Sequence, residues 1–395
     1  MKALVVALAL AAPLVANAAP YTPSGTCGPF PKVDVAVPAG WCMALVADNT
    51  RGLRFPRRIL ELAPNRFWII DMGNWEPRQG RLLEMTLNES ATDPAERVRI
   101  TTLASKLDRP LALAVGPDGK VYVGEAGRIW RTSVTGPVVQ EVVVDGLPDA
   151  GAHPLKEIAF APGNRLFINV GSASDACRDS GNALPFPCPE VEGAQPRAAV
   201  YEAVLGEGTP ALKSLKPYVT GLRNSVALAF VGDTLLQGEN SIDYPDAENP
   251  PEELNVLRAG ARYGWPYCTG DRTPARGYEK KADCKATEAP AQRWPAHAAP
   301  LHLFAVPASN PSPWAGQVLV AWHGHRSTGQ RVMALKVDAK GHPAAAPVQV
   351  VGGWNAAEGV RPKGAPTGLT VDRAGRLWIV EDRNKTVMMV RRESK

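Results

Sequence analysis

Several features that would indicate a membrane protein, a haem protein or a nucleic-acid-binding protein are missing from this chain of 395 residues. Beyond residue 18, no segment approaches the roughly 18 uninterrupted apolar residues that a transmembrane helix needs. No CxxC or CxxCH motif occurs, which argues against a cysteine zinc site and excludes a covalently attached c-type haem. Positive residues are scattered, with no basic run, so the sequence predicts no nucleic-acid partner.

The first 18 residues have the pattern of a secretory signal peptide. Lys2 precedes an apolar run over residues 3–15, and Ala-Asn-Ala at 16–18 supplies the small-x-small pattern of a cleavage site. The run is too short to cross a membrane comfortably. We therefore expect a periplasmic or secreted protein in which residues 1–18 are the signal peptide and residues 19–395 form one domain.

The chain contains six cysteines, an even number that suits disulfides in an oxidising compartment. Metal binding is the rival interpretation, and the missing CxxC spacing disfavours it. Short separations along the sequence favour three local pairs. These pairs are Cys27–Cys42, Cys177–Cys188 and Cys268–Cys284.

One pattern recurs along the chain and decides the predicted fold. An apolar strand with period-2 alternation runs into a short turn such as PDG, PGN or RAG, and a second alternating strand follows. Six copies occur, of which the last is the least regular: 59–73, 111–126, 158–171, 226–240, 368–382 and 317–337. The 36 glycines and 37 prolines disfavour long helices.

The spacing of the copies distinguishes between two all-β folds. Intervals of roughly 45 to 75 residues suit propeller blades with inserted loops. A β-sandwich would also contain alternating strands, but it would not repeat the hairpin together with its lead-in segment. We predict an all-β protein that folds as a six-bladed β-propeller.

The segments that lead into the hairpins resemble one another, as in LDRPLALAV, GAHPLKEIAF, GLRNSVALAF and GAPTGLTV. In a propeller, residues just before each inner strand cluster at one mouth of the central channel. Arg109, His153, Arg223 and Arg361 are therefore expected to converge there. The channel mouth is the default place for a ligand.

Two segments resemble the signature region of the soluble quinoprotein sugar dehydrogenases: YVTGLRNSVALAF at 218–230 and GENSIDYPDAENPPEELNVLRAGARYGWPYC at 238–268. The similarity continues in GAHPLKEIAFAPGNRLFINVGSASDAC at 151–177, HAAPLHLF at 297–304 and APTGLTVDRAGRLWIVED at 365–382. Within that family the chain is most similar to the L-sorbosone dehydrogenase-like branch. The resemblance implies a six-bladed propeller that holds pyrroloquinoline quinone (PQQ) and calcium at the channel mouth.

The resemblance implies roles for four residues at this mouth. His153 corresponds to the general base, a role that suits a side chain whose unperturbed pKa lies near neutrality. Arg223 and Asn224 correspond to an Arg-Asn pair at the cofactor, whose carboxylates a planar arginine can bind with two hydrogen bonds. Arg361 lies where the family has an arginine before the last blade. The alternatives are a solvent-exposed loop histidine and arginines that bond loop carbonyls.

Calcium prefers several hard oxygen ligands, and backbone carbonyls can supply them. In the glucose-oxidising relatives two consecutive carbonyls bind the calcium of the cofactor, and the matching positions here are Ser241 and Ile242. Glu253, at the end of a loop rich in carboxylates, is a candidate ligand for a second, structural ion. A solvated acidic loop is the alternative.

Two departures from the glucose-oxidising relatives bear on activity. Ser172 stands where those relatives have an aspartate beside the catalytic histidine, so His153 lacks the expected carboxylate partner. The sorbosone-like branch also has Gly-Ser at this place. A lysine that contacts the cofactor in some relatives has no counterpart near His323 and His325, and we assign neither histidine.

These observations predict a PQQ- and calcium-dependent dehydrogenase that oxidises sugars or related polyols and aldehydes. The missing haem motif implies that the electrons pass to a separate soluble acceptor, such as a cytochrome. Two alternatives belong to other functional classes. One is a binding or assembly propeller that has lost the cofactor, and the other is a propeller sugar lactonase, which would need Glu, Asn and Asp metal ligands across the channel.

Overall fold

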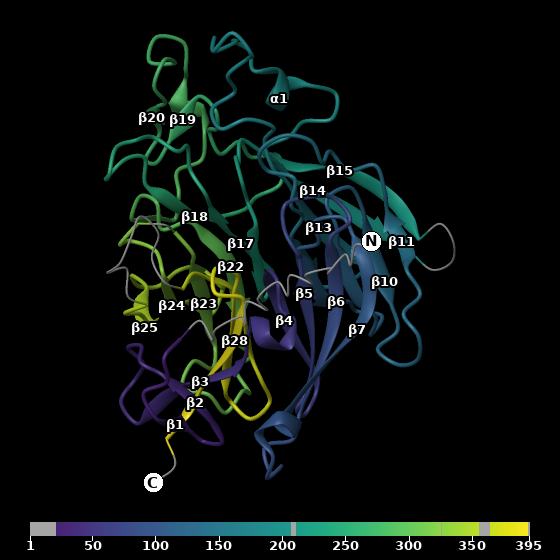
Figure 1. Cartoon of the computed structure of the whole chain (residues 1–395). Helices are drawn as coiled ribbons and strands as arrows, with labels where there is room; N and C mark the ends of the chain where they lie inside the picture. Colours follow the sequence, from purple (N-terminus) through teal and green to yellow (C-terminus); the bar gives the residue numbers. More distant parts are fainter. Residues whose placement is uncertain (1–20, 207–210, 325, 355–363, 394–395) are drawn as a thin grey trace, which may run out of the picture.

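The computed structural model of the protein describes residues 21–206, 211–324, 326–354 and 364–393. The proposed signal peptide at 1–18 lies outside these residues. The described chain forms six antiparallel sheets arranged as blades, together with one small two-stranded sheet (Figure 1). The predicted six-bladed β-propeller is confirmed.

The first three blades are four-stranded sheets in which consecutive strands pair. Blade 1 contains β4 (Pro56–Ala63), β5 (Arg66–Asp71), β6 (Gly80–Leu87) and β7 (Val98–Leu107). Blade 2 contains β8 (Ala112–Val115), β9 (Val121–Gly124), β10 (Ile129–Thr132) and β11 (Glu141–Val144). Blade 3 contains β12 (Ile158–Ala161), β13 (Arg165–Val170), β14 (Ala199–Leu205) and β15 (Leu212–Thr220).

Blades 4 and 5 also have four strands, and blade 6 has six. Blade 4 contains β16 (Ala227–Val231), β17 (Thr234–Glu239), β18 (Glu252–Val256) and β21 (Gln292–Trp294). Blade 5 contains β22 (Pro300–Ala305), β23 (Gln317–Trp322), β24 (Arg331–Lys336) and β25 (Val348–Val351). Blade 6 contains β26 (Pro366–Val371), β27 (Leu377–Glu381), β28 (Thr386–Arg392), β3 (Trp41–Ala47), β2 (Phe30–Val33) and β1 (Thr26–Cys27).

The remaining elements are short. They are β19 (Cys268–Thr269), β20 (Thr273–Pro274), α1 (Pro189–Glu192), η1 (Asn49–Arg51), η2 (Pro94–Arg97) and η3 (Cys284–Ala286). Insertions in blades 3 and 4, which carry α1 and the β19–β20 sheet, lie together at one end of the molecule (Figure 1). No helix in the described ranges is long and apolar enough to cross a membrane.

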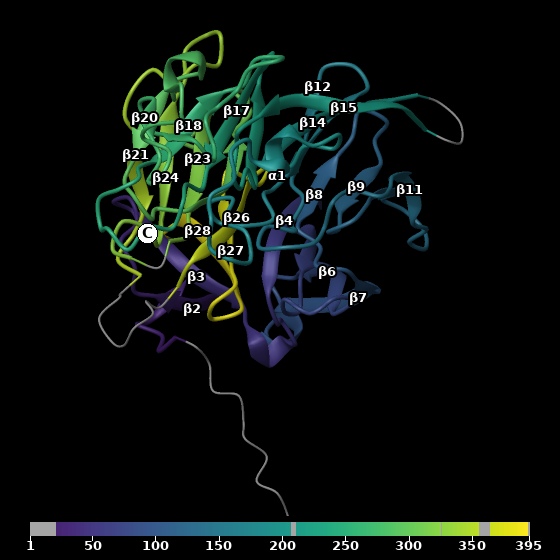
Figure 2. The same ribbon diagram turned by 90° about the horizontal axis from the view of Figure 1, so that it is seen from above.

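The ring of blades is closed by both ends of the chain. The inner strands β4, β8, β12, β16, β22 and β26 contact one another in this order, and β26 contacts β4. Strand β3, near the N-terminus, pairs with β28, near the C-terminus, with Met43 opposite Val390 (Figure 2). Phe67 of blade 1 packs against Trp378 of blade 6, with ring centroids 4.4 Å apart. The closure joins the first and last blades through strand pairing and a shared apolar core.

The repeated hairpins correspond to strands, with one shift of position. Five of the copies are the first and second strands of a blade, joined by tight turns; Gly119 and Gly375 have φ values of +73° and +79° in two of these turns. The irregular copy at 317–337 spans β23 and β24, which are the second and third strands of blade 5. The first strand of this blade is β22, which begins with a proline and lacks a short turn to its partner.

One buried arginine crosses the central channel and ties five blades together. Arg58, in β4, donates from Nε to Glu157 of blade 3 at 2.7 Å. Its two Nη atoms donate to the carbonyl oxygens of Thr367, Val226 and Leu301, at 2.5, 3.1 and 2.7 Å, in blades 6, 4 and 5. The centre of the propeller is therefore plugged by a guanidinium whose partners come from most of the ring.

All three expected disulfides are confirmed. Cys27–Cys42 joins β1 to β3, while Cys177–Cys188 and Cys268–Cys284 close loops within the insertions of blades 3 and 4. The Cα atoms of each pair lie 5.7 to 6.3 Å apart, within the usual range for a disulfide. The local pairs were predictable because each bond closes a separation of only 11 to 16 residues.

Candidate active site

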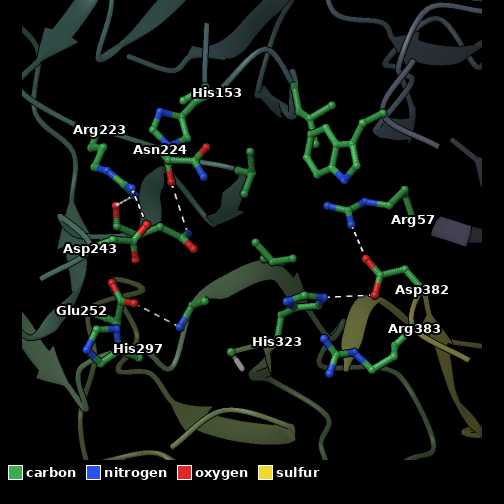
Figure 3. Close-up of a pocket in the computed structure, with 18 of the residues that line it drawn as sticks. Arg57, His153, Arg223, Asn224, Asp243, Glu252, His297, His323, Asp382 and Arg383 are labelled. Atoms are coloured by element: carbon green, nitrogen blue, oxygen red, sulfur yellow. Dashed lines mark hydrogen bonds and ion pairs between the residues drawn. The ribbon is translucent and has the colours of Figure 1, made fainter. Parts of the chain in front are cut away.

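A cavity of about 1040 Å³ lies at one mouth of the channel (Figure 3). Its lining comes from the segments at the starts of β4, β12, β16, β18 and β22 and from the segments after β5, β17, β23 and β27. In an antiparallel blade the start of the first strand lies beside the end of the second, so these segments share one end of the ring. Blade 2 contributes no lining residue among those described.

His153 lies in the cavity wall with its Nδ1 atom facing Ser172. The distances from Nδ1 are 2.9 Å to the Ser172 hydroxyl and 3.0 Å to the Ser172 carbonyl oxygen. The Ser172 hydroxyl donates its own proton to the carbonyl of Ser174 at 2.6 Å. Because both atoms facing Nδ1 then act as acceptors, Nδ1 carries the proton and Nε2 keeps the lone pair.

Burial, reinforced by the positive charge of Arg223, lowers the pKa of His153 to about 3. The imidazole is therefore neutral near pH 7. Gly171 allows the histidine to pack this closely, since a Cβ at that position would lie 2.5 Å from the Cβ of His153. The Gly-Ser pair thus places and orients His153 without a carboxylate.

Arg223 also lines the cavity, but most of its donors are already engaged (Figure 3). Its Nε donates to the carbonyl of Asp175 at 3.1 Å, and one Nη donates to the carbonyl of Asn240 at 3.0 Å. The other Nη lies 2.7 Å from the Asp175 carboxylate and 2.8 Å from that of Asp243. Of the five N–H groups of a guanidinium, one remains, so Arg223 supplies charge without an open fork.

Asn224 follows Arg223 in the cavity wall. Its side-chain amide makes no hydrogen bond to the part of the chain that the structure describes, so both of its polar atoms are open to a ligand. The backbone N–H groups of Arg223 and Asn224 both point to Glu239 Oε1, at 2.5 and 3.4 Å. Burial raises the pKa of Glu239 to about 8. This buried carboxyl fixes the backbone of the Arg-Asn pair.

The residues expected near calcium lie in the segment after β17, which holds Ser241 and Ile242, and at the start of β18, which holds Glu253. Ser241 lines the cavity, and its N–H donates to the carboxyl of Glu252 at 2.6 Å. Ile242 is buried, and its carbonyl accepts a hydrogen bond from the Tyr244 N–H at 3.0 Å. Glu253, the next residue after Glu252 in the strand, points away from the cavity and accepts from the Gly270 N–H at 2.7 Å.

The opposite wall of the cavity is built from three residues that the sequence analysis did not assign. Asp382, just after β27, accepts from Arg57 Nη1 at 2.5 Å and lies 3.0 Å from His323 Nε2 (Figure 3). Within the described residues, the Nε atom of Arg57 is buried and has no hydrogen-bond partner. Arg57 had a signal in the sequence, because FPRRILEL is the lead-in segment of the first blade.

The cavity carries a surplus of positive charge. Its cationic side chains are Arg57, Arg223, Arg326, Arg383 and Lys385. Its carboxyl groups are those of Asp243, Glu252 and Asp382. Burial raises the pKa of Glu252 to about 8, so this carboxyl is largely protonated at pH 7 and the surplus is larger than the formal count. An anionic ligand would be stabilised here.

Of three other residues from the sequence analysis, one lies away from the cavity and two are not described by the structure. Arg109 is absent from the cavity lining and instead forms ion pairs with Asp108 and Asp149. Arg361 and His325 lie outside the described residues. Within the described ranges, no group of three or more His, Cys, Asp or Glu side chains is placed to hold a metal ion.

A family model described as TrAA12-like matches residues 35–393. No curated protein matches the chain. Among solved structures, the iodide structure of the Trichoderma reesei Carbohydrate-Active Enzymes Family AA12 protein is similar, with a TM-score of 0.72 and 18% identity. The match covers 91% of this chain and 98% of that protein.

Two further solved structures have the same architecture. The holo form of the pyranose dehydrogenase PQQ domain from Coprinopsis cinerea has a TM-score of 0.70 and 18% identity, over 92% of this chain and 98% of that domain. The PQQ-bound aldose sugar dehydrogenase from Streptomyces coelicolor has a TM-score of 0.56 and 17% identity, over 90% and 99%. At identities of 17–18%, the TM-scores of these matches show a shared fold and no more.

Proposed function

This chain belongs to the TrAA12-like family, and from that premise we propose that it is a PQQ-dependent sugar dehydrogenase. The observation that carries the proposal is the cationic cavity at the channel mouth, whose lining includes a neutral histidine, the side-chain amide of Asn224 and, on the opposite wall, the guanidinium of Arg57. Similar propellers from Coprinopsis cinerea and Streptomyces coelicolor bind PQQ. The proposal extends that ligand to this chain.

The residues present fit the chemistry of PQQ, a planar quinone with three carboxylates. A cavity of about 1040 Å³ is at the upper end of the range for small-molecule sites. Arg57 lines the cavity and, among the described residues, hydrogen-bonds only through Nη1, to Asp382, while Asn224 offers a side-chain amide. We propose that these two residues bind the cofactor and that Arg223 contributes mainly its charge. The proposed cofactor role of Arg361 rests on the sequence resemblance alone.

Bound PQQ would supply a quinone able to accept two electrons from a sugar carbon. The protein must remove the hydroxyl proton from that carbon's oxygen, and Nε2 of His153 carries the lone pair for this step. Ser172 holds the ring in the required tautomer through Nδ1. An anion near Arg223 would offset part of the charge that lowers the pKa of His153, and so would strengthen the base.

For calcium we propose the carbonyl oxygens of Ser241 and Ile242. The support is the sequence resemblance, the place of Ser241 in the cavity wall, and a calcium structure of the Trichoderma reesei AA12 protein. The described side chains offer too few ligands to hold calcium by themselves, so oxygens of the cofactor would complete the set. Glu253, which lies outside the cavity lining, would serve only a separate structural ion.

The remaining parts of the proposal concern biological context. We propose a protein of the sorbosone-like branch that is exported to the periplasm or the medium, oxidises a sugar there, and passes electrons to a separate acceptor. The three disulfides and the N-terminal sequence pattern support export. The missing CxxCH motif supports a separate acceptor.

Reconstitution tests the proposal. Purified protein is titrated with PQQ in the presence and absence of calcium chloride, and cofactor absorbance and dye reduction are followed with a panel of aldoses. Stoichiometric PQQ uptake with sugar-dependent dye reduction is expected. If the protein takes up no PQQ under either condition, the alternative of a binding propeller without cofactor replaces the dehydrogenase.

A further inference from the structure

One tryptophan stands out on the rim of the cavity. Six large apolar side chains are exposed in the described part of the chain, and Trp75 is the one among them that lines the cavity. It is 54% exposed, although indole is among the side chains that gain most from burial. Large exposed aromatic groups beside a cavity commonly mark ligand contacts.

The loop that carries Trp75, between β5 and β6, is held in place from beneath. Asp71, fully buried at the end of β5, accepts hydrogen bonds from the N–H groups of Phe55 and Gly73 at 2.6 and 3.1 Å. Gly73 has a φ of +77°, and a Cβ there would lie 2.3 Å from the carbonyl oxygen of Gln79. These contacts give the loop one defined path.

Among the described aromatic residues, one ring packs against the indole. The ring of Phe55 packs edge-on against Trp75, with centroids 6.4 Å apart and an angle of 66° between the planes. Phe55 also lines the cavity, and the guanidinium of Arg57 lies 5.5 Å from its ring. The rim therefore places a fixed aromatic surface next to hydrogen-bonding groups, an arrangement pre-organised for a ligand with an apolar face and polar edges.

A pyranose ring has this combination of surfaces. Its C–H groups form an apolar face, and its hydroxyls project from the edge toward hydrogen-bonding partners. We propose that Trp75 is a stacking platform for the pyranose ring of the substrate. The proposal rests on the proposed sugar dehydrogenase function and deepens it, because it selects cyclic aldoses over open-chain polyols, which lack a ring face.

The test uses Trp75→Ala and Trp75→Phe, with Phe186→Ala as the matched control. Phe186 is 52% exposed, similar to Trp75, but it is absent from the cavity lining. Binding of D-glucose and of D-sorbitol, its open-chain alcohol, is measured by saturation-transfer NMR on protein without cofactor. PQQ affinity, KM and kcat are measured after reconstitution.

We expect Trp75→Ala to weaken D-glucose binding and raise KM by about tenfold or more, with kcat changed less than about threefold. Trp75→Phe should recover part of the loss, and Phe186→Ala should match the parent. D-sorbitol should bind the parent more weakly than D-glucose does, and should lose little in Trp75→Ala. PQQ affinity should stay within about twofold in all variants.

Several results would overturn the inference. Unchanged D-glucose binding and KM in Trp75→Ala would remove the platform. A parallel loss of PQQ affinity would make Trp75 a cofactor contact instead, and equal dependence of D-sorbitol binding on Trp75 would refute selection for a ring. If the parent takes up no PQQ, the dehydrogenase proposal fails separately, and the NMR comparison alone tests the stacking platform. Weaker D-glucose binding in Trp75→Ala than in the parent then supports the platform. Equal binding in both proteins, or no binding to the parent, refutes it.

Discussion

Replacing Arg58 by methionine should cost more stability than any change to an exposed ion pair of this protein. Methionine keeps an unbranched apolar stem like that of arginine but donates no hydrogen bond. Glu157 would lose its charged partner while fully buried, a situation that typically costs about 3–5 kcal/mol. The carbonyls of Thr367, Val226 and Leu301 would also lose donors. Because such losses are not additive, we expect about 4–5 kcal/mol in total.

The deficit should depend on pH in a defined direction. Burial raises the pKa of Glu157, and Arg58 acts against this rise. Without the arginine the folded-state pKa rises further, so the folded protein binds a proton that the unfolded chain releases near pH 4 to 5. The penalty is therefore largest at pH 8, and it shrinks as pH falls toward 5.

Urea denaturation followed by tryptophan fluorescence, at pH 8 and pH 5.5, measures both effects. Arg165→Met is the control, because Arg165 pairs with Glu202 in an ion pair whose arginine side chain is 46% exposed, and its loss should cost under about 1 kcal/mol. A second change, Glu157→Met in the Arg58→Met background, should recover part of the loss by removing the unpaired charge. A deficit below about 1 kcal/mol, or one that grows as pH falls, would refute this account of the channel plug.

Three further predictions concern the cavity and the insertions. His153→Ala should lower turnover by about 10²–10⁴-fold without loss of PQQ uptake, and full activity in this variant would make the histidine structural. In the parent, the pH below which activity is lost should lie well under 6.5, because the pKa of His153 is lowered to about 3. Arg57→Ala should weaken PQQ binding by about tenfold or more, and more than Arg223→Ala does, in a titration followed by absorbance; the reverse order would contradict the donor count. Replacing Cys177 and Cys188 by serine should lower stability by about 3 kcal/mol in the chain-entropy model, measured by thermal unfolding; an unchanged midpoint would show that the loop is held by other contacts.

The blades were predictable because their signal is local. Alternation around a tight turn identifies a hairpin from about 15 adjacent residues. The closure of the ring was missed, since β3 reads WCMALVA, an apolar run without alternation, and its partner β28 lies at the far end of the chain. Pairing between distant segments leaves no trace in a local pattern. β22, whose first residue is Pro300, had no hairpin signal because residues 306–316, rather than a short turn, separate it from β23.

The site was predictable only to the level of segments. The lead-in pattern predicted His153 and Arg223 at the channel mouth, and both line the cavity, as does Asn224, which the family resemblance had indicated. The same pattern failed for Arg109, whose guanidinium is held by two neighbouring aspartates away from the cavity. In the Glu-Glu pair at the start of β18 the sequence analysis chose Glu253, whereas the first glutamate lines the cavity. Successive strand residues face opposite sides, and a sequence does not show which side faces the ligand.

Because most N–H groups of Arg223 are already engaged, other residues of the cavity are expected to hydrogen-bond an anionic ligand. A motif identifies an arginine but does not show whether its N–H groups are still available. Here Asp175, Asn240 and Asp243 take four of the five, so the guanidinium holds two loops together and contributes a fixed positive charge. Direct hydrogen bonding to an anion then falls to other donors, among them Arg57 across the cavity, which bonds only through Nη1, to Asp382, in the described part of the chain. Binding of an anionic cofactor would therefore depend on two arginines on opposite sides of the channel mouth. Arg223 would contribute positive charge, and Arg57 would contribute directed hydrogen bonds.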